Sequence, residues 1–73
     1  MPHLPVLSGK QLIKVLEKMG YRQIRQRGSH IRLRHDTKKP QTVPSSTVIG
    51  RGLLRKIIRD TEISREEFLD FLK

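Results

Sequence analysis

One short segment combines the residue types that are needed to cleave a phosphodiester. The segment His30-Ile31-Arg32-Leu33-Arg34 alternates polar and apolar residues, so in a β-strand Ile31 and Leu33 point to one side. His30, Arg32 and Arg34 then point together toward solvent. Histidine exchanges a proton near neutral pH, and arginine binds phosphate in a fixed forked geometry. A proton-transfer group beside phosphate binders is the combination that cleavage of an RNA backbone requires.

The charge of the chain favours a polyanionic partner. Its 73 residues include 16 Lys and Arg but only 7 Asp and Glu, which gives a formal net charge of +9. Most of the acidic residues lie in the last quarter, so residues 8–59 are more basic still. Binding to a membrane surface is disfavoured, because no expected helix pairs a basic face with large exposed aromatic residues. The sequence therefore predicts a nucleic-acid partner and no membrane.

The length of the chain and its lack of cysteine limit the classes of protein that remain possible. The chain has no cysteine, which excludes disulfides and thiolate metal sites and suits a reducing cytoplasm. No apolar run approaches the ~20 residues of a membrane span, and the N-terminal residues lack the pattern of a signal peptide. We expect a single cytoplasmic domain over residues 1–73, with a short tail at 1–7 and a folded part at 8–73.

Apolar residues at helical spacing predict three helices. The first begins after Ser8 as N-cap, ends at Gly20 as C-cap, and has an apolar stripe of Leu12, Ile13, Val15, Leu16 and Met19. The second runs from about Arg51 to Asp60, with an inner side of Leu53, Leu54, Ile57 and Ile58 and an outer row of Arg55, Lys56 and Arg59. A capping box at Ser64–Glu67 opens a short last helix, whose apolar side is Phe68, Leu69 and Leu72.

Three short strands are expected between the first two helices. They span residues 21–26, 30–34 and 41–43, with a turn at Arg27-Gly28, a polar turn at 36–40 and a loop at 45–50. So few apolar residues cover only one face of the sheet, which predicts a two-layer α+β domain with its helices on one face. The covered face carries Ile24, Ile31, Leu33 and Val43. The open face carries Gln23, Arg25, His30, Arg32, Arg34 and Thr42.

Six short motifs follow one another along nearly the whole chain. They are Ser8-Gly9-Lys10-Gln11-Leu12-Ile13, Met19-Gly20-Tyr21, Gln26-Arg27-Gly28-Ser29-His30, Thr42-Val43-Pro44, Gly52-Leu53-Leu54-Arg55-Lys56-Ile57-Ile58 and Ser64-Arg65-Glu66-Glu67-Phe68. In this order the motifs resemble the HicA family, also called YcfA-like proteins, which are toxins of prokaryotic toxin–antitoxin systems. One departure is Ser45, since family members often carry a histidine after the Val-Pro step.

The resemblance implies a fold, an activity and a partner. The fold is like that of a double-stranded RNA-binding domain, an α-β-β-β-α arrangement with a three-stranded antiparallel sheet. The activity is that of a ribonuclease, an mRNA interferase that cleaves messenger RNA and arrests translation. The partner is a HicB-like antitoxin that covers the active face. The catalytic histidine of the family corresponds to His30.

A mechanism follows from the chemistry of RNA, which supplies its own nucleophile in the 2′-hydroxyl. We hypothesise that His30 transfers the proton and that positioned cations stabilise the phosphorane-like transition state. The candidate cations are, in order, Arg32, Arg25 and Lys10. The other predicted RNA-binding residues are Arg27, Ser29 and Arg34. The expected products carry 2′,3′-cyclic phosphate and 5′-hydroxyl ends.

No metal or cofactor is expected. The basic segment lacks the carboxylate cluster of a two-metal nuclease, and the three histidines lack a spacing that places them around one zinc ion. His35 alternates with Ile31 and Leu33, away from the basic face, and is expected to be structural or solvent-exposed. His3 lies in the tail and has no expected role.

Two other functions stay open. The chain is alternatively a non-catalytic RNA-binding module that uses the same basic sheet. Its three aromatic residues are too few for binding by base stacking, so the contacts are expected to be to phosphates and 2′-hydroxyls. It is otherwise mainly an interaction partner of an antitoxin. The acidic segment from Glu62 to Asp70 is then either a contact surface or simply a capped, soluble helix, and the helix is favoured. Loss of cleavage with retained binding distinguishes the enzyme from the binding module.

Overall fold

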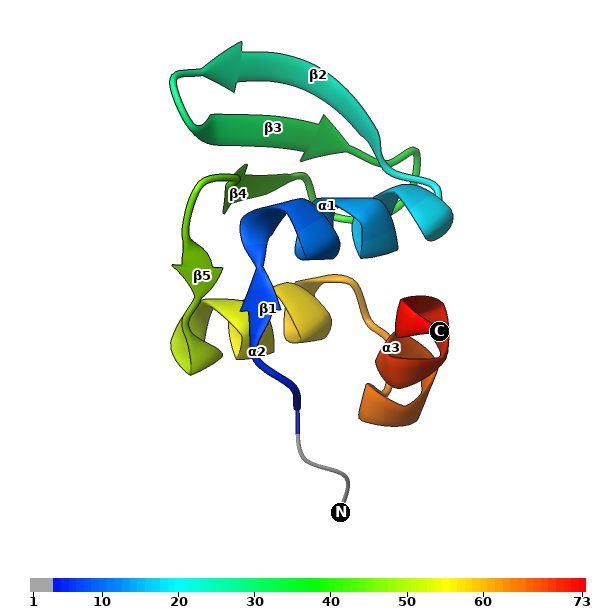
Figure 1. Ribbon diagram of the computed structural model, residues 1–73. Helices are drawn as coiled ribbons and strands as arrows, with labels where there is room; N and C mark the ends of the chain where they lie inside the picture. Colours follow the sequence, from blue (N-terminus) through cyan, green and yellow to red (C-terminus); the bar gives the residue numbers. More distant parts are fainter. Residues whose placement is uncertain (1–3) are drawn as a thin grey trace.

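The structure, a computed structural model, describes residues 4–73 and contains one main sheet covered by helices on one side (Figure 1). The sheet is antiparallel in the order β2-β3-β4, and β1 pairs with β5 in a separate two-stranded sheet. The elements are β1 (Leu7–Ser8), α1 (Gly9–Lys18), β2 (Arg22–Arg27), β3 (His30–Arg34), β4 (Gln41–Pro44), β5 (Val48–Ile49), α2 (Arg51–Asp60) and α3 (Arg65–Leu72). The predicted α+β class is confirmed, and the order matches the α-β-β-β-α arrangement of a double-stranded RNA-binding domain.

Helix α1 lies directly against the sheet. At its start the Ser8 hydroxyl accepts a hydrogen bond from the Gln11 amide (3.2 Å), and the Gln11 side chain accepts one from the Ser8 amide (2.9 Å), which completes a capping box. Its buried side chains are Leu12, Ile13, Val15 and Leu16. The C-cap is Met19, one residue before the predicted Gly20. Gly20 follows with a φ of 107°, a left-handed conformation that glycine adopts at little cost.

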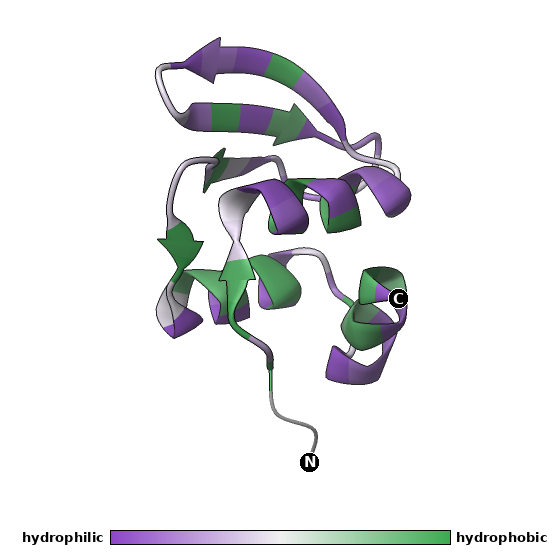
Figure 2. Ribbon diagram, in the orientation of Figure 1, coloured by the Kyte–Doolittle hydropathy of each residue, from purple (hydrophilic) through white to green (hydrophobic). Residues whose placement is uncertain are grey.

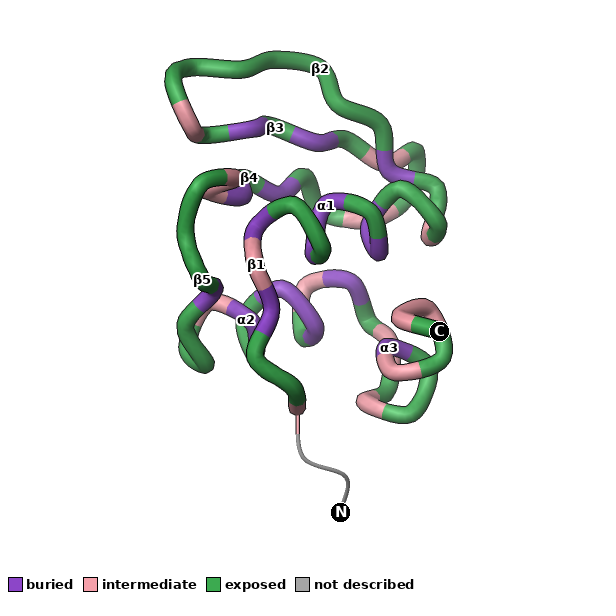
Figure 3. The backbone as a smooth tube through the Cα atoms, viewed as in Figure 1, coloured by how far each residue is buried: buried purple, intermediate pink, exposed green. Residues whose placement is uncertain are grey.

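The two faces of the sheet differ as predicted along β3 and β4. The core face carries three apolar side chains that are at most 5 % exposed, Ile31, Leu33 and Val43. Alternate residues of β3 point to the open face and are exposed, namely His30, Arg32 and Arg34. Figure 2 shows this alternation along β3 as hydropathy and Figure 3 shows it as burial. One face of the sheet is therefore left to solvent.

Strand β2 departs from its prediction at Ile24. This residue, expected in the core, is 51 % exposed and lies beside Arg32 on the open face. The pairing shifts here, since Gln23 lies opposite Leu33 whereas Arg25 lies opposite Arg32. Ile24 is thus the extra residue of a β-bulge, which interrupts the regular alternation of side chains.

The same bulge moves Gln23 to the other face. Gln23 was expected on the open face, but it shares the helix-covered side with its cross-strand partner Leu33. Its amide donates to the Glu17 carboxylate of α1 at 3.4 Å. Both incorrect assignments in β2 have this single cause.

A second small sheet replaces part of the predicted tail and loop. Leu7 of β1 pairs with Ile49 of β5, and both side chains are 4 % exposed and belong to the core. The expected tail is therefore wrong at Leu7, and the expected loop at 45–50 is wrong where β5 forms. Strands of two residues are too short to show an alternating pattern. His3 lies outside the described residues.

Helices α2 and α3 form as expected. The buried residues of α2 are Leu54, Ile57 and Ile58. Helix α3 begins with the predicted capping box, in which Ser64 accepts from the Glu67 amide and Glu67 from the Ser64 amide, and it buries Phe68. Within residues 4–73 no helix is long and apolar enough to cross a membrane.

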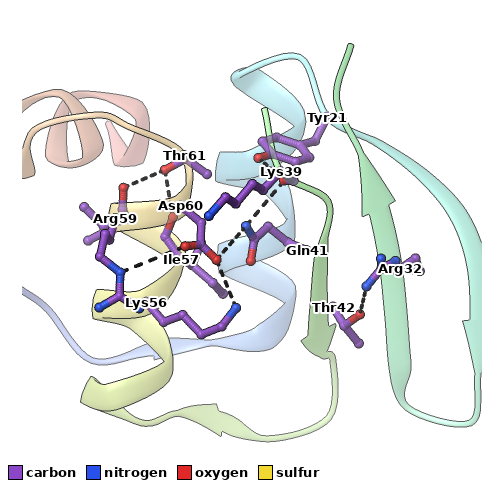
Figure 4. Close-up of polar contacts among 11 residues, drawn as sticks. Tyr21, Arg32, Lys39, Gln41, Thr42, Lys56, Ile57, Arg59, Asp60 and Thr61 are labelled. Carbon is purple, nitrogen blue, oxygen red and sulfur yellow. Dashed lines mark hydrogen bonds and ion pairs between the residues drawn. The ribbon is translucent and has the colours of Figure 1, made fainter. Parts of the chain in front are cut away.

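A polar cluster joins the C-terminal end of α2 to the edge of the sheet (Figure 4). It consists of Tyr21, Lys39, Gln41, Lys56 and Asp60. The Tyr21 hydroxyl donates to the Lys39 carbonyl oxygen at 2.7 Å, and Gln41 donates to the same oxygen at 3.4 Å and to the Asp60 carboxylate at 3.5 Å. Lys56 pairs with Asp60 at 3.0 Å. The Asp60 carboxylate, which lies beside the sheet, is thus bonded to both Lys56 and Gln41.

These contacts set the acidity of two groups. Burial raises the pKa of Tyr21, which favours its neutral, hydrogen-bond-donating form. The hydrogen bond from Lys56 lowers the pKa of Asp60, which favours its charged carboxylate. The cluster is therefore stabilised in the charge state that its hydrogen bonds require.

Candidate active site

A groove lies on the open face of the sheet beside the turn between β2 and β3. It has a volume of about 500 Å³ and is lined by Ile24, Arg25, Arg27, His30, Arg32 and Thr42. Four of the predicted site residues therefore lie together, namely Arg25, Arg27, His30 and Arg32. All four side chains are exposed.

The groove gathers positive charge without neutralising it. Across the strands Arg25 lies opposite Arg32, and Arg27 lies opposite His30. None of these three arginines forms an ion pair with a carboxylate of residues 4–73. Like charges on opposite strands repel each other, and an anion bound between them removes that cost. Guanidinium groups bind the oxygens of phosphate and carboxylate groups in pairs, so the groove is suited to an oxyanion of this kind.

Arg32 is held in place by its neighbouring strand. Its Nη1 donates to the Thr42 hydroxyl at 2.9 Å, from the position directly opposite on β4 (Figure 4). This bond uses one of the five N–H donors of the guanidinium and leaves the others for a ligand. A side chain that is already oriented loses less conformational entropy when it binds.

The backbone that carries His30 is anchored to β4 and α1. His30 pairs with Pro44, and the preceding Ser29 carbonyl oxygen accepts two hydrogen bonds from Ser45, from its amide at 2.7 Å and its hydroxyl at 2.9 Å. Pro44 packs closely on Gly9, where an added Cβ would overlap the Pro44 carbonyl oxygen. The start of α1 therefore fixes β4, and β4 fixes the hairpin end at His30.

The turn before His30 is a tight two-residue loop of Gly28 and Ser29. Gly28 has a φ of 55° at the first loop position, where a glycine with positive φ suits a type II′ hairpin turn. The Gln26 side chain donates to the Gly28 carbonyl oxygen at 2.9 Å and closes the loop. This turn brings Arg27 directly opposite His30.

The two described histidines have contrasting surroundings. The His35 ring is half-buried, packs on Tyr21 with centroids 5.0 Å apart, and donates from Nε2 to the Met19 carbonyl oxygen at 3.2 Å. Its Nδ1 then accepts from the Thr37 amide at 3.1 Å. His35 is structural, one of the two roles expected for it. The exposed His30 ring makes no hydrogen bond to residues 4–73, so both of its nitrogens are free for a ligand.

The open face continues beyond the groove toward Arg34. An adjoining hollow shares Ile24 and Arg32 with the groove and extends to Arg34 and Lys38. Asp36 also lies there, but its carboxylate pairs with Arg22 at 3.1 Å. The predicted residue Arg34 thus lies along the same face as His30, outside the groove itself.

Besides Arg34, two predicted site residues do not line the groove. Lys10 lies on α1 and borders a separate hollow with Glu17, Gln23 and Ile31, on the helix-covered side of the sheet. Ser29 contributes its backbone carbonyl to the anchor described above. Lys10 is thus not brought beside His30, and Ser29 supports the turn.

Besides Thr42, which was predicted only to lie on the open face, two residues of the site were not identified from the sequence. Ile24 adds an apolar surface between the arginines because of the bulge, which no local signal in the sequence marks. Ser45 ties the hairpin to β4, and its place directly after the Val43-Pro44 step was the one available signal. Both residues shape the groove that the charged side chains line.

The fold and the groove define a class of protein, a small α+β domain with a basic, histidine-containing open face. Within residues 4–73 no three His, Asp or Glu side chains are grouped as metal ligands. A family model described as the HicA toxin of bacterial toxin–antitoxin systems matches residues 9–63. No curated protein matches the sequence.

The chain belongs to the HicA toxin family. It is therefore a toxin of a toxin–antitoxin system, and membership implies an antitoxin as its partner. The matched residues include all of the groove and both of its anchors, at Gly9 and Ser45.

Proposed function

We propose that this toxin is a metal-independent endoribonuclease that cleaves messenger RNA in the groove, with His30 as its catalytic residue. One observation carries the proposal. An exposed imidazole without a hydrogen-bond partner among residues 4–73 stands among three guanidinium groups that lack carboxylate partners there. Such a group is free to exchange protons beside a bound phosphate.

The reaction needs only the substrate and these side chains. His30 removes the proton of the 2′-hydroxyl while the 2′-oxygen bonds to phosphorus. The bond from phosphorus to the 5′-oxygen breaks, and the imidazolium returns the proton to that leaving oxygen. The products are a 2′,3′-cyclic phosphate and a 5′-hydroxyl, and His30 ends in its starting state.

Arg32 and Arg25 stabilise the charge that develops on the phosphate oxygens. They lie opposite each other on neighbouring strands and both line the groove. Arg32 is already oriented by Thr42, so its donors need little rearrangement during the reaction. Arg27, opposite His30, holds the phosphate or its neighbour beside the imidazole.

The substrate is a single-stranded stretch of RNA that runs along the open face. The groove and its adjoining hollow are both open and share Ile24, which offers an apolar contact to an unstacked base. Arg34 continues the track of positive charge. We place this activity in the cytoplasm, where messenger RNA is translated, and we propose that a HicB-like antitoxin inhibits it by covering the same face.

The test compares wild type with His30→Ala and His30→Asn on cleavage and binding of an unstructured RNA, without added metal. We expect the variants to bind RNA and to cleave it about 10²–10⁴-fold more slowly, the contribution of a general acid–base group. Added imidazole should restore part of the activity of His30→Ala. Arg59→Ala, a charge change on the outer row of α2, serves as the control for handling and folding.

A non-catalytic RNA-binding module remains the second candidate, because the same charges favour binding without cleavage. If wild type and both His30 variants bind RNA but none cleaves it, the module is correct and the catalytic role is rejected. Equal cleavage by all of them would place the activity outside the groove.

A further inference from the structure

Three arginines converge on a second hollow, away from the sheet. This hollow lies between α2 and α3 and is lined by Leu4, Arg51, Arg55 and Arg65. It shares no residue with the groove. In Figure 1 the sheet lies at one end of the molecule and α2 and α3 at the other, so these are two separate positive surfaces.

The local electrostatics are unfavourable unless an anion is present. Arg51 and Arg55 are four residues apart on one helix, a spacing at which like charges repel. Both Arg51 and Arg65 occupy the first turn of a helix, where the helix dipole disfavours a cation. None of the three arginines forms an ion pair with a carboxylate in the described part of the chain.

The start of α2 also favours an anion, because it lacks the side-chain cap that the other two helices have. Helices α1 and α3 begin with capping boxes, whereas Gly50 caps α2 without a side-chain hydrogen bond. The first turn of α2 contains no acidic residue. In α3 the Glu67 carboxylate is already bonded to the Ser64 amide. The first turn of α3 carries Glu66 as well, but neither Glu66 nor Glu67 forms an ion pair with an arginine of the hollow within residues 4–73.

The size of the hollow selects a small anion. Its volume is about 50 Å³. That is room for roughly four water-sized groups, since each requires about 10–15 Å³. A tetrahedral phosphate fits this space and a nucleotide base does not. Arginines bind phosphate oxygens through paired N–H groups, and three of them surround the hollow.

We propose that Arg51, Arg55 and Arg65 form a second phosphate-binding site. We favour RNA as the source of this phosphate. The longest dimension of the protein is only 35 Å, so one messenger RNA can reach both the groove and the hollow. This part rests on the proposed function. A free phosphate ligand is the other source, and the two are separated by experiment.

The first experiment titrates the full chain with inorganic phosphate and follows the arginine side-chain signals by NMR. In wild type the signals of Arg51, Arg55 and Arg65 should shift together. Arg55→Ala should weaken phosphate binding roughly ten-fold, the loss expected for a charge-assisted contact. Arg55→Lys keeps the positive charge but loses the paired N–H donors of guanidinium, so its phosphate affinity should lie between those of wild type and Arg55→Ala. Arg59→Ala removes the same charge from the same helix outside the hollow and should bind like wild type.

The second experiment measures binding of a short 2′-O-methyl RNA over a range of salt concentrations. This RNA has no free 2′-hydroxyl, so the result does not depend on cleavage. Loss of one phosphate contact in Arg55→Ala should reduce the slope of log affinity against log salt by about 0.7. Arg59→Ala should leave the slope unchanged.

The outcomes are distinguishable from those of the catalytic test. A lost phosphate response with an unchanged RNA slope supports the site and assigns it to a free phosphate ligand. Equal phosphate and RNA binding by Arg55→Ala and Arg59→Ala overturns the proposal. A response to an acidic peptide with none to phosphate also overturns it, in favour of a protein partner. Circular dichroism verifies that each variant is folded.

Discussion

The groove and the polar cluster share strand β4 but differ in how far their charged side chains are paired. In β4, Thr42 faces the groove and Gln41, its neighbour, faces the polar cluster. In the cluster the Asp60 carboxylate is bonded by Lys56 and Gln41, and within residues 4–73 no buried side-chain nitrogen or oxygen lacks a partner. In the groove three guanidinium groups have no carboxylate partner among those residues.

This difference indicates that the polar cluster stabilises the fold, whereas the charges of the groove are available for function. A satisfied polar network fixes one arrangement of the chain, here the attachment of α2 to the sheet edge. Uncompensated charges on an exposed face add little to stability and remain available to a ligand. The two histidines follow the same division, since His35 is bonded on both nitrogens while His30 has no partner within residues 4–73. Substitutions in the two regions should therefore change different properties.

Apart from the His30 variants, the largest effect is expected for Arg32→Ala. Loss of one donor that stabilises a transition-state anion lowers the turnover rate by about 10²–10³-fold. The free energy of unfolding should change by no more than about 0.5 kcal/mol, because the side chain is exposed. RNA cleavage kinetics and urea denaturation of the same samples test both parts, with Arg59→Ala as the control of equal charge. A large loss of stability would show that the groove arginines are structural.

A smaller effect, on stability, is expected for Asp60→Asn. The pKa of Asp60 is depressed by the hydrogen bond from Lys56. A carboxyl group with a lowered pKa stabilises the fold above its unfolded pKa of about 3.9, and this contribution is lost as the pH falls through its folded pKa. Wild type should therefore be more stable than the variant at pH 7, and the difference should shrink in acid.

Thermal unfolding measured from neutral to acid pH tests this prediction. Asp70→Asn removes the same charge from an exposed side chain and should show a smaller difference at pH 7. RNA cleavage by Asp60→Asn at a temperature where it is folded should equal that of wild type. Loss of activity there would mean that the polar cluster and the groove are coupled.

Much of the fold was predictable because its elements have strong local signals. Ser8 as an N-cap and the capping box at Ser64 marked two helix starts, and the alternation in 30–34 assigned both faces of β3. The gathering of Arg25, Arg32 and His30 then followed from strand pairing. These signals lie within a few residues of one another, where propensity and pattern act directly.

The incorrect parts depend on contacts distant in sequence. The bulge at Ile24 is defined by the register against β3, and it alone reversed the faces assigned to Ile24 and Gln23. Leu7 is buried because it pairs with Ile49, more than forty residues away. The separation of Lys10 from the groove likewise depends on how α1 packs under the sheet. No local pattern encodes these arrangements.

The most direct test of the account determines the ends of the RNA fragments. Wild-type protein should cleave an unstructured RNA without added metal, and mass spectrometry should find 2′,3′-cyclic phosphate and 5′-hydroxyl ends. The same fragments should be greatly reduced with His30→Ala. Fragments with 5′-phosphate and 3′-hydroxyl ends would show that water or another nucleophile attacks, and would contradict cleavage by the 2′-hydroxyl with His30 as the proton-transfer group.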